Sequence, residues 1–151
     1  MTRSNARELA VHLIYELDYT GELPEEAIAT RLDKEVYADL AGENEVYAER
    51  PSKKQLAYIQ NCVSGVFIHQ QTLDEAIAKN AIGRGVHRIS RLTKAALRLA
   101  MYEILYVEDV PTAVAINECV ELTRRYEDDS VVSFVNGVLG SFARSLTEAA
   151  R

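Results

Sequence analysis

Apolar residues recur at intervals of three and four along almost the whole chain, and the strict alternation typical of strands is nearly absent. In the first stretch, one helical stripe runs from Ala6 to Leu17 and stops before Gly21. Comparable stripes follow at 27–40, 56–67, 92–104, 114–122 and 131–142. Such helices gain stability by burying their apolar faces against one another. The sequence therefore predicts an all-α fold.

Prolines and capping residues mark where the expected helices begin. Pro24, Pro51 and Pro111 each suit the first turn of a helix. Two segments read as capping boxes: Ser52-Lys53-Lys54-Gln55, and Thr72-Leu73-Asp74-Glu75, which would open a short helix through Ile77. Further boundaries are expected at the Gly83-Arg84-Gly85 break, at Ser90 as a cap of a helix to about Val107, and at Asp128-Asp129-Ser130. These signals predict about seven helices.

Length and composition indicate one globular domain, 1–151. The 151 residues can bury a sizeable core, and no linker, repeat or low-complexity tract interrupts them. The longest apolar stretches are far too short to span a membrane, and the N-terminal segment lacks the apolar region of a secretory signal. Cys62 and Cys119 are isolated, so we expect two buried thiols in a reducing, cytoplasmic environment.

No motif of a known catalytic or cofactor site is present. The sequence contains no Walker A loop, GxSxG elbow, HExxH helix or GxGxxG turn. His12, His69 and His87 are dispersed, and none stands at helical spacing from another histidine or a cysteine. We therefore expect a protein that is not an enzyme and has no cofactor and no metal.

Charge is divided unevenly along the chain. The net charge of −6 argues at first sight against a nucleic-acid partner. However, residues 16–49 hold eleven acidic and two basic residues, whereas residues 76–102 hold six basic residues and no acidic one. Because salt screens charges beyond about 8–10 Å, a partner responds to the local potential rather than to the total. One local RNA-binding surface is compatible with this distribution.

The basic segment predicts such a surface on a helix and on the loop before it. Arg91, Lys94, Arg98 and Tyr102 fall within roughly an 80° arc of an ideal helix, opposite the apolar face. The preceding glycine-flanked loop, 83–88, adds Arg84, His87 and Arg88. Arginine binds phosphate with two donors and can stack on bases. A solvated basic face that pairs with the acidic segment is the alternative interpretation.

The start of the chain supplies a second basic element. Arg3 and Arg7 are four residues apart in the first helix, so we expect them to project together. Tyr15 lies two turns after Arg7, close to the same face. It could stack on a base or belong to the core, and the sequence leaves both open.

Four segments, in this order and spacing, resemble the NusB family of bacterial transcription antitermination factors along nearly the whole chain. They are Ala6-Arg7-Glu8-Leu9-Ala10 with Tyr15, the stretch ALRLAMYEI at 96–104, the stretch VPTAVAINECVEL at 110–122, and Phe134-Val135-Asn136-Gly137-Val138-Leu139. The resemblance implies two packed helical bundles without a cofactor. It also implies binding to boxA-type RNA of ribosomal leader transcripts, together with the small-subunit ribosomal protein NusE, within an RNA polymerase antitermination complex.

The resemblance places RNA contacts on the N-terminal arm, the loop before the ALRLA helix and the FVNG segment. The matching positions here are Arg3, Arg7, Tyr15, Arg84, Arg88, Arg98, Phe134 and Asn136, to which the basic stripe adds Arg91 and Lys94. The arm is sparser in arginine than is usual for the family, and Ser133 stands where a lysine is common. Each arginine lost removes about one phosphate contact. These departures therefore lower the expected affinity for RNA.

Candidates for contact with a protein partner are Tyr102, Glu103, Asn117, Glu118 and Asp129. Tyr102 and Glu103 could instead form a buried hydrogen-bonding pair. Asn117 is also interpreted as satisfying backbone groups where helices meet, and Gly137 as allowing a close helix approach. Two other functions remain open: a protein-only helical adaptor whose RNA face has weakened, and an accessory RNA-binding domain for an rRNA methyltransferase. The sequence allows a homodimer through the first helix and predicts no membrane partner.

Overall fold

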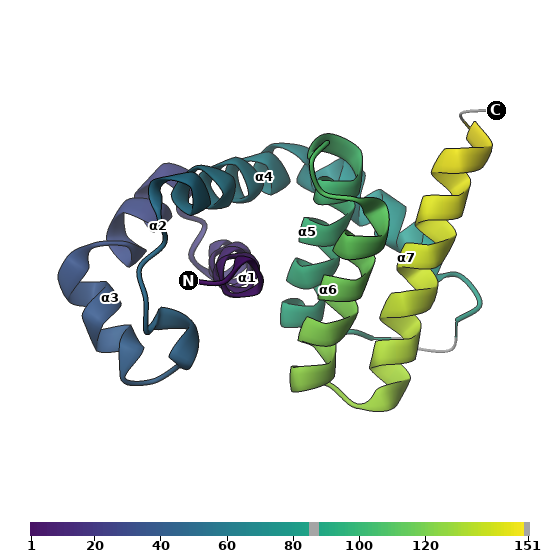
Figure 1. The fold of residues 1–151 in the computed structure, drawn as a ribbon. Helices are drawn as coiled ribbons and strands as arrows, with labels where there is room; N and C mark the ends of the chain where they lie inside the picture. The colour runs from purple at the N-terminus through teal and green to yellow at the C-terminus, as the bar shows by residue number, and fades with distance from the viewer. Residues whose placement is uncertain (85–87, 150–151) are drawn as a thin grey trace. The chain divides into compact units, whose positions relative to one another are not determined.

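The computed structural model describes residues 1–84 and 88–149, and within them it is helical, with no strand. The elements are α1 (Arg3–Thr20), α2 (Pro24–Arg31), α3 (Lys34–Ala41), a short 3-10 helix η1 (Glu45–Tyr47), α4 (Lys53–Ala81), α5 (Arg91–Tyr106), α6 (Thr112–Tyr126) and α7 (Asp129–Ala149). Figure 1 shows them in chain order. The predicted all-α class is confirmed.

The chain divides into two compact units, Met1–Ile68 and His69–Arg151, here called the N-terminal and C-terminal units. In the N-terminal unit, Thr2 caps α1 by accepting a hydrogen bond from the Asn5 N–H, and Gly21 ends the helix with φ of 67°. Its core includes Leu9 and Leu13 of α1 and Ile59 of α4, all almost completely buried.

The helix expected over 27–40 is divided in two. The Asp33 side chain accepts hydrogen bonds from the N–H groups of Glu35 and Val36 and thereby caps α3. An aspartate that binds its own downstream backbone competes with helix continuation, which explains why the apolar stripe continues while the helix does not.

The second predicted capping box is wrong, because α4 continues through it without interruption. The first box forms as expected: the Ser52 N–H donates to Oε1 of Gln55 at 2.9 Å, and the Gln55 N–H donates to the Ser52 hydroxyl at 3.2 Å. Thr72–Glu75 instead lies inside the 29-residue helix, where Leu73 is buried. The number of α-helices among the described residues therefore agrees with the prediction, although one expected boundary, at Thr72, is absent and one unexpected boundary, at Asp33, is present.

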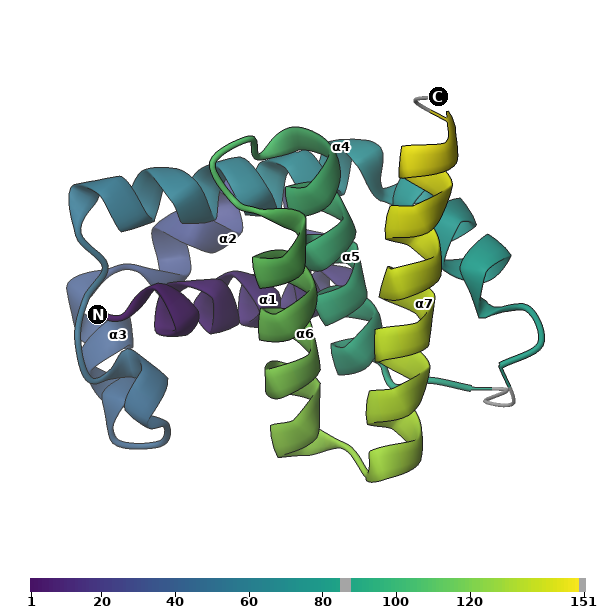
Figure 2. The same cartoon turned by 45° about the vertical axis from the view of Figure 1, so that its right-hand side comes forward.

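In the C-terminal unit, α5, α6 and α7 pack side by side, as both Figure 1 and Figure 2 show. Leu97 and Met101 of α5 and Val135 and Leu139 of α7 form a completely buried core. Ser90 caps α5 as predicted, since its hydroxyl accepts from the Thr93 N–H at 3.1 Å. None of the described helices is long and apolar enough to cross a membrane.

Candidate nucleic-acid interface

Arg84 has a fixed position after the end of α4. Its Nε donates to the carbonyl oxygen of Asn80 at 2.9 Å. Asn80 is itself held, because its Nδ2 donates to the Ala76 carbonyl at 2.8 Å and its Oδ1 accepts from the Ser141 hydroxyl at 2.7 Å. Arg84 remains exposed to solvent. The two terminal nitrogens of its guanidinium are therefore oriented, and they donate no hydrogen bond to the described residues.

Gly137 of α7 makes room for this guanidinium. A Cβ atom at that position would lie 2.6 Å from Nη1 of Arg84. The glycine was expected to allow two helices to approach, whereas its nearest neighbour is the arginine side chain. Asn136, next along α7, is exposed. Arg84 and the FVNG segment, which the sequence predicted as separate parts of one RNA surface, thus meet within the C-terminal unit.

Arg88 and Arg91 are exposed, and Arg88 has no ion-pair partner among the described residues. Lys94 is partly exposed and lies 3.9 Å from Oδ2 of Asp74. His87 falls outside the described residues. Three of the predicted basic side chains in this segment, those of Arg84, Arg88 and Arg91, are therefore exposed at the surface.

The rest of the predicted basic stripe does not face solvent. Arg98 is only 3% exposed, and it binds Asp74 through Nε at 2.7 Å and through Nη2 at 2.9 Å. Tyr102 is 6% exposed, with its ring centroid 5.2 Å from that of Tyr106. The expectation of an exposed face failed because α4 is continuous and presents Asp74 to α5. Arg98 is thus bound in an ion pair rather than displayed for a ligand.

The N-terminal arm is also only partly exposed. Arg3 is exposed, whereas Arg7 is 6% exposed with its guanidinium carbon 6.0 Å from the centroid of the Tyr58 ring. The two arginines do not project together, because a cation over an aromatic face is stabilised inside the unit. Tyr15 is half-buried, and its hydroxyl donates to that of Tyr19 at 3.3 Å. Phe134, on α7, belongs to the core.

The candidates for a protein-partner surface are not all at a surface. Glu103 is only 1% exposed, and Tyr102 is buried as described above. Glu118 is half-buried, while Asn117 and Asp129 are exposed. Asn117 was interpreted as a group that satisfies backbone where helices meet, but its exposure contradicts that role. A partner surface made of all five residues is not present.

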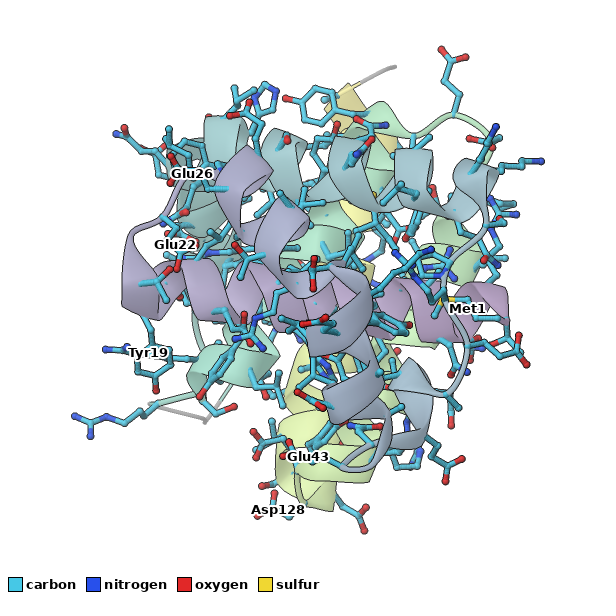
Figure 3. All side chains as sticks on the ribbon, turned by 90° about the vertical axis from the view of Figure 1, so that its left-hand side faces the viewer. Met1, Tyr19, Glu22, Glu26, Glu43 and Asp128 are labelled. Atoms are coloured by element: carbon cyan, nitrogen blue, oxygen red, sulfur yellow. The ribbon has the colours of Figure 1, made fainter. Side chains whose placement is uncertain are left out.

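The acidic residues of the N-terminal unit are mostly exposed. Figure 3 shows Tyr19, Glu22 and Glu26 at the margin of this unit, with side chains directed outward. Glu16 is an exception, because its Oε1 forms an ion pair with Nη2 of Arg31 at 2.5 Å. Burial raises the pKa of Glu16, and the Arg31 charge opposes that rise. The acidic residues of 16–49 thus present a negative, mostly solvated surface.

Both cysteines are buried free thiols, as expected. Burial raises the pKa of Cys119 to about 12, so it stays protonated and unreactive. The described residues contain no group of three or more histidine, cysteine or carboxylate side chains that could hold a metal ion.

Comparison with known proteins identifies the family of this chain. The model of the NusB family matches residues 4–144. The transcription antitermination protein NusB of Symbiobacterium thermophilum is 36% identical over 99% of this chain and 94% of its own length. The Bacillus subtilis protein of the same name is 34% identical over 99% of this chain and all of its own length.

Solved structures have the same fold. A crystal structure of antitermination factors NusB and NusE in complex with dsRNA matches with a TM-score of 0.71 and 24% identity, covering 95% of this chain and 96% of that one. The solution structure of NusB from Aquifex aeolicus matches with a TM-score of 0.67 and 23% identity, over 99% and 94% of the two chains. The chain belongs to the NusB family of transcription antitermination proteins.

Proposed function

We propose that this antitermination factor binds boxA-type RNA of ribosomal leader transcripts through the C-terminal unit, around Arg84. The observation that carries the proposal is the anchored Arg84 guanidinium, which lies against Gly137 beside the exposed Asn136 and whose terminal nitrogens donate no hydrogen bond to the described residues. A guanidinium held in place can bind a phosphate with two donors at little further cost in side-chain entropy. Arg88 and Arg91 extend the same basic segment toward α5.

The remaining sequence candidates have different roles in this proposal. Arg3 adds a phosphate contact from the N-terminal unit, with Tyr15 and Tyr19 as the aromatic groups that a base could reach. Arg7, Arg98 and Phe134 support the fold, because each is buried. Lys94 contributes positive potential rather than a free contact, since it is close to Asp74. The RNA surface is therefore smaller than the sequence pattern suggests, and affinity is modest.

A basic protein partner compensates for this small surface. One solved relative of the same fold is a complex of NusB with NusE and dsRNA. The exposed acidic residues of the N-terminal unit offer charge complementarity to a basic ribosomal protein. We propose that NusE binds this chain and strengthens RNA binding, and that the assembly joins RNA polymerase. Both units, residues 1–151, would then act as one functional domain, and a homodimer of the free protein is compatible with the exposed end of α1.

The test is a titration of labelled boxA-type RNA, followed by fluorescence anisotropy, with and without NusE. The chain alone should bind the RNA weakly, and binding should be tighter in the presence of NusE. Arg84→Gln should weaken binding about fivefold, since an exposed charged contact contributes ~1 kcal/mol. Arg124→Gln is the matched control, because Arg124 is exposed in the same unit and its Nε lies 3.6 Å from Oε1 of Glu121. Equal affinities for the two variants would contradict the proposed surface.

A protein-only adaptor is the second candidate, and the burial of Arg7 and Arg98 favours it. Two of the basic residues expected at the RNA surface are then structural. The same titration separates the two functions: binding of NusE without any measurable RNA affinity would support the protein-only adaptor.

A further inference from the structure

A second arginine lies on the face of α7 that the Arg84 side chain contacts. Ser133, Gly137, Gly140 and Arg144 follow one another at spacings of four, three and four residues, so they share one face of the helix. A Cβ atom at Gly140 would lie 3.3 Å from Nη1 of Arg144. The Arg144 side chain therefore runs back along α7 toward the N-terminal end of the helix, as long helical side chains generally do. Two guanidinium groups thus lie against neighbouring glycines.

These two groups have no acidic partner among the residues that the structure describes. Arg31, Arg98 and Arg124 form ion pairs with carboxylates in their own units. Among the described residues, Arg84 makes only its Nε bond to a backbone carbonyl, and Arg144, which is exposed, makes none. In a chain with a net charge of −6, two neighbouring cations without a carboxylate between them form a local positive site.

The glycines give this site its shape. Residues three apart on a helix have Cβ positions roughly 5–6 Å from each other. Because Gly137 and Gly140 lack side chains, each guanidinium group lies low on the helix surface, beside glycines that are three residues apart. A polyanion with regularly spaced charges can approach the helix closely there. Arginine donates two hydrogen bonds to a single phosphate, which favours successive phosphates of a nucleic-acid strand over scattered anions.

We propose that Arg84 and Arg144 form a two-arginine phosphate clamp on α7, so that bound RNA continues past Asn136 and Gly137 onto the second half of the helix. This inference rests on the proposed RNA-binding function and adds one residue, Arg144, that neither the basic stripe nor the FVNG segment includes. The clamp contributes affinity and length of RNA covered rather than base recognition, since phosphate contacts carry no sequence information directly.

The test compares Arg144→Gln with Arg124→Gln in the full-length chain, by anisotropy titration of boxA-type RNA at several salt concentrations. Arg144→Gln should weaken binding about threefold to fivefold and lower the slope of log affinity against log salt by about 0.7, the value for one phosphate contact of a single strand. Arg124→Gln should change neither quantity. Arg144→Lys should keep most of the salt slope and lose part of the affinity, because a lysine keeps the charge but not the two-donor geometry.

The possible results distinguish failure of the two-arginine clamp from failure of the proposed RNA-binding function. If Arg84→Gln weakens binding while Arg144→Gln behaves like Arg124→Gln, the clamp is wrong and the RNA-binding function stands. If the wild-type chain binds no RNA with or without NusE, the function itself is wrong. Circular dichroism and thermal melting of each variant show whether a loss of affinity comes from a loss of folding; a folded Arg144→Gln variant with unchanged affinity overturns the clamp.

Discussion

Arg98 and Asp74 form a two-point ion pair that ties α5 to α4 inside the C-terminal unit. Arg98 is buried, its Nε and Nη2 lie 2.7 and 2.9 Å from the two carboxylate oxygens, and Asp74 is about one-third exposed. Burying a guanidinium costs free energy of solvation, which the attraction to its carboxylate offsets. If the carboxylate is removed, that cost remains and nothing offsets it. The pair therefore matters most when one member is removed.

Asp74→Asn should destabilise the chain by about 2–3 kcal/mol, which is the range for a charged hydrogen-bonded partner of a buried group. Urea unfolding followed by circular dichroism measures the difference. Glu121→Gln is the control, because its pairing with Arg124 is exposed and contributes at most about 0.5 kcal/mol. Similar free energies of unfolding for the two variants would show that Arg98 does not depend on Asp74.

The continuity of α4 can be tested at its two candidate capping boxes. Ser52→Ala should cost about 1 kcal/mol, because the Ser52 hydroxyl accepts the Gln55 N–H at the start of the helix. Thr72→Ala should be neutral or stabilising by a few tenths of a kcal/mol, since Thr72 is exposed inside the helix and alanine is the better helix former. Thermal unfolding of both variants gives the comparison. A clear loss of stability in Thr72→Ala would indicate that a helix begins there.

Gly137→Ala should separate folding from RNA binding. The new Cβ would meet Nη1 of Arg84 at 2.6 Å, and the flexible end of that side chain can move away. Alanine replaces glycine inside a helix, so stability should stay level or rise by up to ~1 kcal/mol. RNA affinity should fall nonetheless, because the guanidinium leaves its position. A thermal melt and an RNA titration of the same sample provide both readouts, and unchanged affinity would mean that the position of Arg84 is unimportant.

The cap of α7 predicts a contribution to stability that depends on pH. The hydrogen bond from the Ser130 hydroxyl, together with that from the Val131 N–H, lowers the pKa of Asp128 below its ordinary value of 3.8. A lowered folded-state pKa stabilises the fold above the unfolded-state value, and the contribution is lost as the pH falls through the folded-state pKa. Asp128→Ala should therefore be less stable than wild type at pH 7, with the difference shrinking below pH 3.8. Urea unfolding across this pH range would contradict the cap if the difference stayed constant.

Local signals in the sequence predicted most helix ends, because Gly21, Ser90 and Asp128 act on backbone groups within a few residues of themselves. The position of a side chain was harder to predict where it depends on a residue far away in the sequence. The stripe that contains Arg98 has the spacing of an exposed face, and only the continuation of α4 shows that Asp74 faces it. Arg7 likewise has the spacing of a projecting arm, yet its position depends on Tyr58, about fifty residues later. The contact of Arg84 with Gly137 joins two segments that the sequence indicated separately, without showing that they meet.

The salt dependence of RNA binding by wild type and by Arg84→Gln shows whether Arg84 contacts an RNA phosphate. Anisotropy titrations of boxA-type RNA, in the presence of NusE and over a range of salt concentrations, give the slope for each protein. Arg84→Gln should bind about fivefold more weakly, and its slope should be smaller by about 0.7, which corresponds to the loss of one phosphate contact. Identical affinity and slope for the two proteins, with RNA still bound, would contradict the assignment of Arg84 to the RNA surface.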